Sequence, residues 1–130
     1  MSALLTTLLI AMFLPYLAKL PLMKAMHERG GYDNRHPRQQ QAALEGFGAR
    51  ANAAHYNSFE ALMVYASAVF ITVSLGAVDA VAIALGWTFV VARIGYMVCY
   101  WLDKATIRSL IWLVSMIASF GMAIRAILIS

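Results

Sequence analysis

Four long apolar windows restrict how this sequence can fold more than any other feature does. They cover roughly residues 4–26, 53–75, 78–102 and 107–129, and each reaches the length of about 20 residues that an α-helix needs to cross the hydrocarbon of a bilayer. Only 12% of the residues are charged and 62% are hydrophobic, whereas soluble domains are about one-quarter charged. The sequence therefore predicts an integral membrane protein with four spanning helices.

The connections between the windows predict an up-and-down arrangement. The second and third windows meet at SLGAVDA, and the third and fourth meet at LDKATIR. Connections this short make consecutive helices antiparallel, so we expect an all-α four-helix bundle formed by residues 1–130 as one domain. The first window has no basic residue before it and no small-residue cleavage pattern after it, and we interpret it as a retained helix rather than a signal peptide.

The distribution of basic residues predicts the orientation in the membrane. The loop at residues 27–50 and its borders hold Lys24, Arg29, Arg35, Arg38 and Arg50. Lys104 and Arg108 flank the third connection, while the second has no lysine or arginine. The positive-inside rule then places the first and third connections in the cytoplasm and both termini on the other side. The net charge of +4 is not gathered into the basic stripe that nucleic-acid binding needs, so we expect no nucleic-acid partner.

A polar stripe runs along one face of the second window. On a helix that turns about 100° per residue, Arg50 and Asn57 lie about 20° apart and Glu60 lies about 60° from Asn57. Arg93, Tyr96 and Tyr100 share a face of the third window in the same way. At 1.5 Å per residue, Glu60 and Arg93 both lie about 10–15 Å inside the cytoplasmic end. Because a charge in lipid is costly without a partner, we expect Glu60 and Arg93 to form an ion pair.

More polar groups gather at this cytoplasmic third than one ion pair requires. They are Asn57, Tyr96, Tyr100, Arg108 and Ser109. A concave, cationic and aromatic-lined pocket suits an anionic small molecule with an apolar reaction partner that arrives from the bilayer. The alternative is that these groups only hold two helices together. The sequence leaves open whether Lys19 reaches the membrane surface or faces the pocket.

Other kinds of site find little support. His27, His36 and His55 lack metal-ligand spacing, and we expect no metal site. No phosphate-binding glycine loop or nucleophile elbow is present, and the single Cys99 cannot form an intrachain disulfide. A thin four-helix bundle also has little interior to satisfy its polar groups. We therefore expect an oligomer, with a monomer whose polar groups satisfy one another as the alternative.

With these residues identified, the sequence resembles the MAPEG family, the membrane-associated proteins in eicosanoid and glutathione metabolism, and in particular its bacterial-type members. The segment AAHYNSFEAL matches an R-A-H-x-N-x-x-E type motif, ARIGYMVCY matches R-x-x-[HY]-x-x-x-Y, and IRSL carries the arginine of the fourth helix. The resemblance spans nearly the whole chain. It implies a homotrimer in a bacterial inner membrane, with glutathione sites that open toward the cytoplasm. The implied partners are membrane lipids and a lipophilic small molecule that reacts at these sites.

The resemblance also implies a role for each matching residue. Asn57 and Glu60 would hold the backbone and amino end of glutathione, and Tyr96 and Tyr100 its peptide portion. Arg93 would be the partner of Glu60 at the binding site. Arg108 and Ser109 would act on the thiol as catalytic residues, favouring the thiolate that attacks a lipophilic electrophile.

Three positions depart from the family pattern. Family members that bind glutathione commonly have arginine at the positions of Ala53 and Tyr56, and several have tyrosine where Trp112 stands. Arg50 or Lys24 is a candidate for replacing the missing charge. The resemblance as a whole implies a glutathione-dependent transferase or peroxidase. The missing arginines favour an alternative, a non-catalytic family member that acts as a membrane scaffold or lipid-binding protein. A further alternative is an unrelated four-helix protein such as a transporter subunit.

Overall fold

The computed structural model describes residues 1–130, which form five α-helices and no strand. The helices are α1 (Ser2–Glu28), α2 (Pro37–Ala42), α3 (Phe47–Ser74), α4 (Ala80–Trp101) and α5 (Ala105–Ile129). All except the short α2 are long and apolar enough to cross a membrane. The predicted all-α membrane bundle with four long helices is confirmed.

The second long helix begins earlier than the apolar window indicated. α3 starts at Phe47 rather than near residue 53. Gly46 separates it from α2 and has a φ of 56°, a backbone conformation that costs a glycine far less than a residue with a Cβ. As a result, Arg50 lies within the first turn of α3 rather than in a loop.

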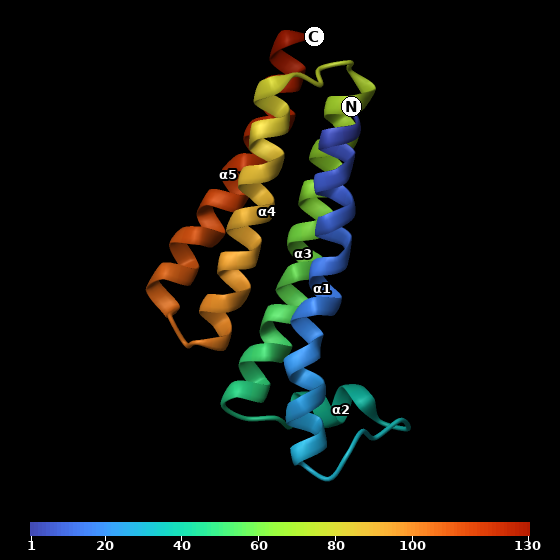
Figure 1. Cartoon of the computed structure of the whole chain (residues 1–130), viewed down its shortest axis with the longest axis vertical. Helices are drawn as coiled ribbons and strands as arrows, with labels where there is room; N and C mark the ends of the chain where they lie inside the picture. Colours follow the sequence, from blue (N-terminus) through green and yellow to red (C-terminus); the bar gives the residue numbers. More distant parts are fainter.

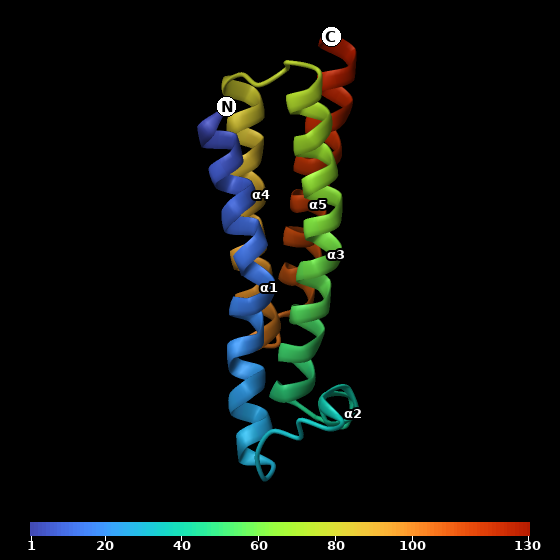
Figure 2. The same cartoon turned by 90° about the vertical axis from the view of Figure 1, so that its right-hand side faces the viewer.

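The long helices run antiparallel to their neighbours in the chain (Figure 1). Around the bundle the order is α1, α3, α5, α4, so that α1 and α5 occupy opposite corners and make no contact (Figure 2). Both termini lie at the same end as the α3–α4 connection, and α2 and the α4–α5 turn lie toward the other end. We call this second end the α2 end.

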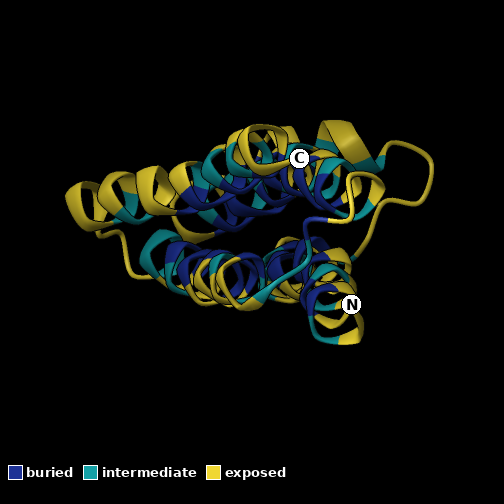
Figure 3. Ribbon diagram, turned by 90° about the horizontal axis from the view of Figure 1, so that it is seen from above, coloured by how far each residue is buried: buried dark blue, intermediate teal, exposed yellow.

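Apolar residues occupy both the inside and the outside of the bundle. Buried residues face the space between the helices, whereas the outward faces are exposed (Figure 3). Inside, the rings of Tyr65 and Phe89 stack with centroids 4.0 Å apart. Outside, large apolar side chains such as Phe70 and Leu128 are 72% and 79% exposed. An outer surface of this kind suits lipid rather than water.

A close contact joins three helices in the half of the bundle nearer the termini. The hydroxyl groups of Thr7 on α1 and Tyr65 on α3 form a hydrogen bond, and Gly86 on α4 packs against it. A Cβ added at Gly86 would lie 2.9 Å from each of these two hydroxyl oxygens. The absence of a side chain at Gly86 therefore allows α4 to approach α1 and α3 this closely.

An ion pair ties α5 to the turn between α3 and α4. Asp79 caps α4 by accepting a hydrogen bond of 3.0 Å from the amide of Ala82. Its two carboxylate oxygens also accept hydrogen bonds of 3.1 and 2.6 Å from the guanidinium of Arg125. Asp79 lies in a connection that has no basic residue, and it is therefore paired with an arginine of the last helix.

Candidate functional site

Arg93 lies at the contact between α3 and α4 in the half of the bundle nearer the α2 end. It is only 3% exposed, and its Nη2 donates a hydrogen bond of 2.7 Å to Oδ1 of Asn57. Its guanidinium carbon lies 4.1 Å from the centre of the Tyr96 ring, which is a cation–π contact. The structure therefore places three predicted site residues, Asn57, Arg93 and Tyr96, in one cluster.

The prediction that Glu60 and Arg93 of one chain form an ion pair is wrong. Glu60 is exposed, and the three ion pairs of the chain involve neither Glu60 nor Arg93. In the structure, α3 is rotated so that Asn57 faces Arg93, and Glu60, about 60° around the helix, lies at the exposed edge of that face. In place of a carboxylate, Arg93 contacts a neutral amide oxygen and an aromatic ring, and its Nη1 has no hydrogen-bond partner.

The cluster continues through aromatic rings to the start of α5. The rings of Tyr96 and Tyr100 meet edge to face with centroids 5.3 Å apart. The guanidinium carbon of Arg108 lies 4.2 Å from the centre of the Tyr100 ring. The Arg108 side chain has no carboxylate partner, since all three ion pairs involve other residues. Its positive charge therefore remains available to a ligand.

A small pocket opens beside this cluster. Its volume is about 200 Å³, and it is lined by Asn57, Tyr96, Arg108, Ser109 and Trp112. Four of these five residues were predicted as site residues from the sequence. Trp112 was noted only as a departure from the family pattern, and the structure shows that it forms part of the wall.

The other predicted residues lie outside this pocket. Arg50 donates a hydrogen bond of 3.1 Å from Nε to the backbone oxygen of Tyr100, which ties the start of α3 to the end of α4. Lys24 pairs with Glu28 on the surface at 4.0 Å.

The Ser109 hydroxyl, at the pocket, donates to the backbone oxygen of Ala105 at 3.2 Å. That distance exceeds the roughly 2.5–3.0 Å of usual O–H···O hydrogen bonds, so turning the hydroxyl toward a ligand would break only a weak bond.

A second polar pocket lies on another side of the bundle, between α1, α2 and α3. Its volume is about 310 Å³, and it is lined by Lys19, Tyr32, Pro37, Arg38, Gln41, His55, Tyr56 and Phe59. No acidic residue is among these residues. His55 is turned toward α1, where its Nδ1 lies 2.6 Å from the backbone oxygen of Pro15. The structure thus places Lys19 in a pocket separate from that of Asn57, which the sequence could not decide.

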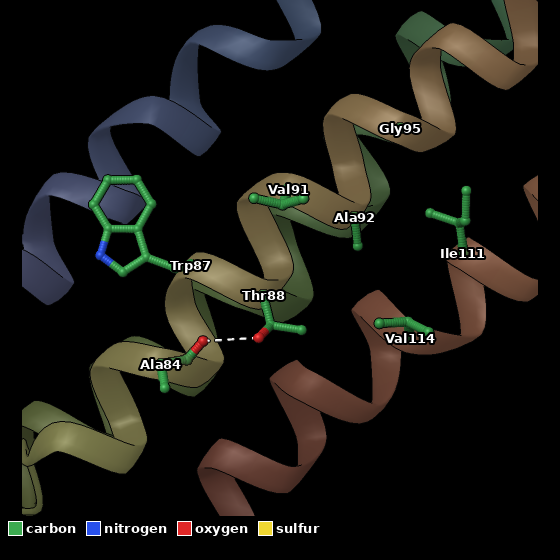
Figure 4. A pocket seen from close by; sticks show the side chains of 8 residues that line it. All are labelled: Ala84, Trp87, Thr88, Val91, Ala92, Gly95, Ile111 and Val114. Carbon is green, nitrogen blue, oxygen red and sulfur yellow. Dashed lines mark hydrogen bonds between the residues drawn. The ribbon is translucent and has the colours of Figure 1, made fainter.

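A large apolar groove lies between α4 and α5 (Figure 4). It measures about 700 Å³ and is lined by Ala84, Trp87, Thr88, Val91, Ala92, Gly95, Ile111 and Val114. The Thr88 hydroxyl donates to the backbone oxygen of Ala84 at 2.8 Å. With this hydroxyl engaged in its own helix and no charged residue in the lining, the groove does not suit the anionic molecule expected from the sequence.

Comparison with known proteins agrees with the motifs in the sequence. The sequence profile of the MAPEG family matches residues 3–128 of the chain. This span contains all the residues that line the two polar pockets. No curated protein and no solved structure matches.

Proposed function

Because this chain belongs to the MAPEG family, a family of membrane-bound proteins of glutathione metabolism, we propose that it is a glutathione-dependent transferase or peroxidase acting on lipophilic electrophiles. The observation that carries the proposal is the pocket formed by Asn57, Tyr96, Arg108, Ser109 and Trp112. It combines an unpaired cation with hydrogen-bonding side chains on helices that can cross a membrane. A polar thiol and an apolar substrate can meet at such a place.

Arg108 supplies the electrostatic part of the chemistry. A thiol has a pKa of about 8.5 and is mostly protonated at neutral pH, and a fixed positive charge nearby favours the thiolate. The Ser109 hydroxyl, once turned from Ala105, adds a hydrogen bond to the sulfur. The thiolate then forms a bond to an electrophilic carbon, and a leaving group such as halide departs from that carbon with the bonding electron pair. With a hydroperoxide, the thiolate instead bonds to one oxygen, the O–O bond breaks, and the other oxygen leaves as an alkoxide that takes up a proton. A second glutathione thiol then reduces the resulting sulfenic acid to the disulfide and water.

Glutathione carries two carboxylates and one ammonium group, and the residues that line the pocket can bind only some of these charged groups. We propose that Asn57, Tyr96 and Tyr100 hold its peptide portion and that Glu60 pairs with its ammonium group. The Glu60 carboxylate is exposed and has no basic partner in the chain. A ligand amine would therefore also relieve an uncompensated charge in a membrane-spanning helix.

A neighbouring subunit would complete the site in a homotrimer. At about 200 Å³ the pocket is smaller than the roughly 300–1,000 Å³ of typical ligand sites. It also holds a single cation, Arg108, for two ligand carboxylates. The pocket between α1, α2 and α3 contains Lys19 and Arg38 without an acidic residue. We propose that these two residues of the neighbouring subunit replace the arginines that family members have at Ala53 and Tyr56.

The alternative is a non-catalytic scaffold or lipid-binding protein. Two observations favour it: the lost arginines at Ala53 and Tyr56, and the apolar groove of about 700 Å³ between α4 and α5. An acyl chain would fit the chemistry of that groove. Under this alternative the polar pocket has a structural role only.

Titration calorimetry of the detergent-solubilised protein with glutathione separates the two functions. The proposed enzyme should bind glutathione saturably and should consume a chlorodinitrobenzene electrophile in its presence. A folded protein that binds a fatty acid but neither binds glutathione nor turns over the electrophile would refute the enzyme proposal.

A further inference from the structure

We propose that Arg93 is a positioning residue that turns the Asn57 side chain so that its NH₂ group, and not its oxygen, faces the ligand pocket. The inference refines the proposed function, because it assigns to Asn57 an oxygen atom of glutathione as its partner. Arg93 itself is not among the residues that line the pocket. It acts on the ligand through Asn57 and Tyr96.

The chemistry of the two side chains settles how the Asn57 amide is turned. An asparagine amide has an oxygen that only accepts hydrogen bonds and a nitrogen that only donates them, and the two are easily exchanged in a structure. A guanidinium has donors and no acceptor. The atom of Asn57 that lies 2.7 Å from Nη2 of Arg93 must therefore be the oxygen. The NH₂ group is then on the other side of the amide.

The NH₂ group of Asn57 is free to bind a ligand. It has no hydrogen-bond partner in the chain, and it is not one of the buried polar atoms that lack a partner. Since Asn57 lines the pocket, this accessible donor joins the guanidinium of Arg108 there. Two donors in one small pocket call for a ligand acceptor, such as a peptide carbonyl or carboxylate oxygen of glutathione.

Arg93 is held firmly enough to fix this orientation. It is 3% exposed, and the Tyr96 ring covers its guanidinium at 4.1 Å. No carboxylate lies within ion-pair distance, and its Nη1 is buried without a partner. The Asn57 oxygen is thus the only hydrogen-bond acceptor that Arg93 has in the chain, so turning the amide would leave the whole guanidinium without one.

The variant Asn57→Asp tests the orientation and the ligand contact separately. One aspartate oxygen would still accept from Arg93 and would add an ion pair, while the other would present an acceptor to the pocket in place of the NH₂ group. We expect the melting temperature to stay equal or rise. We expect the affinity for glutathione to fall by about 10- to 100-fold, the range for a lost hydrogen bond to a charged group.

Two variants at Arg93 provide the matched comparison. Arg93→Lys keeps a donor for the Asn57 oxygen, whereas Arg93→Met removes it. In the methionine variant the KM for glutathione should rise while kcat changes little, because Arg108 is untouched, and the lysine variant should recover part of the affinity. A purely structural role of Arg93 would instead lower the amount of folded protein without changing KM.

The outcomes distinguish this inference from the proposed function. A folded Asn57→Asp variant that binds glutathione as tightly as the wild type would overturn the donor role of Asn57. A clear drop in its melting temperature would overturn the orientation, whatever the ligand. If the wild type binds no glutathione while Asn57→Asp is as stable as expected, the proposed function fails and the orientation of Asn57 stands.

Discussion

Arg108 is the single residue on which the proposed chemistry depends most directly. Its guanidinium covers the Tyr100 ring and has no carboxylate partner. We expect Arg108→Ala to lower the turnover of a model electrophile by about 100-fold, the effect of removing one electrostatic donor, with a smaller loss of glutathione affinity. Lys104→Ala, which removes an exposed charge one turn away, is the control. Equal turnover by Arg108→Ala and the wild type would favour the scaffold alternative.

Gly86 is the residue at which the close packing of three helices can be tested. A methyl group there would press on the Thr7–Tyr65 hydrogen bond, and overpacking of a core usually costs about 1–3 kcal/mol. We expect Gly86→Ala to lower the melting temperature in detergent. Gly121→Ala is the matched control, because a Cβ at Gly121 meets nothing within 4 Å. Equal melting temperatures for the two variants would contradict the close approach of α4 to α1 and α3.

At the scale of helices, the contact of Asp79 with Arg125 links α5 to the α3–α4 turn and should respond to acid. Hydrogen bonds from Arg125, and then from the Ala82 amide, lower the pKa of Asp79 below its ordinary value of about 3.9. A carboxyl group whose pKa is lower in the folded than in the unfolded state stabilises the folded state at pH values above the unfolded-state pKa. This contribution is lost as the pH falls through the lower, folded pKa.

Melting temperatures measured from about pH 6 down to about pH 2 would reveal this loss. Asp79→Asn is the control, since its amide oxygen can still cap α4 at Ala82 but does not titrate. We expect the wild type to lose more stability than the variant across this range, and the two to converge at the acid end. Parallel curves with a constant difference would show that the Asp79 carboxylate does not provide the acid response.

At the scale of the whole molecule, the outward position of Glu60 argues for an oligomer. A carboxylate on the outer face of a membrane-spanning helix is costly unless another chain or a ligand covers it. We expect native mass spectrometry in mild detergent to detect a trimer. Glu60→Gln, which removes the charge and keeps the shape, should bind glutathione more weakly without abolishing the trimer. A wild-type spectrum with monomer alone would contradict the shared site.

The orientation in the membrane is a second property of the whole molecule. Both termini lie at one end of the bundle, and the loop that holds more basic residues than any other connection lies at the other. By the positive-inside rule we expect a periplasmic reporter fused after Ser130 to be active and a cytoplasmic reporter to be silent. Fused within residues 30–36, the cytoplasmic reporter should be active and the periplasmic reporter silent. Activity of the cytoplasmic reporter at Ser130 would reverse the proposed orientation.

The sequence by itself determined the helices and most of the Asn57 pocket. Long apolar windows in lipid can only be helices, and an even number of antiparallel helices brings both termini to one end. The helical period then places Tyr96 on an inward face, and the short α4–α5 connection brings Arg108 and Ser109 to the same depth. These inferences succeeded because they depend on distances along the helices, which the residue numbers give directly.

Only the tertiary structure decided which side chains meet between the helices. Glu60 and Asn57 lie at similar depths, and the sequence does not say which of them α3 turns toward Arg93. The rotation of α3 about its own axis is set by packing with α1, α4 and α5 together, and it selected Asn57. The pocket that contains Lys19 and Arg38 likewise exists only because α2 folds back beside α1 and α3, which no helical period predicts.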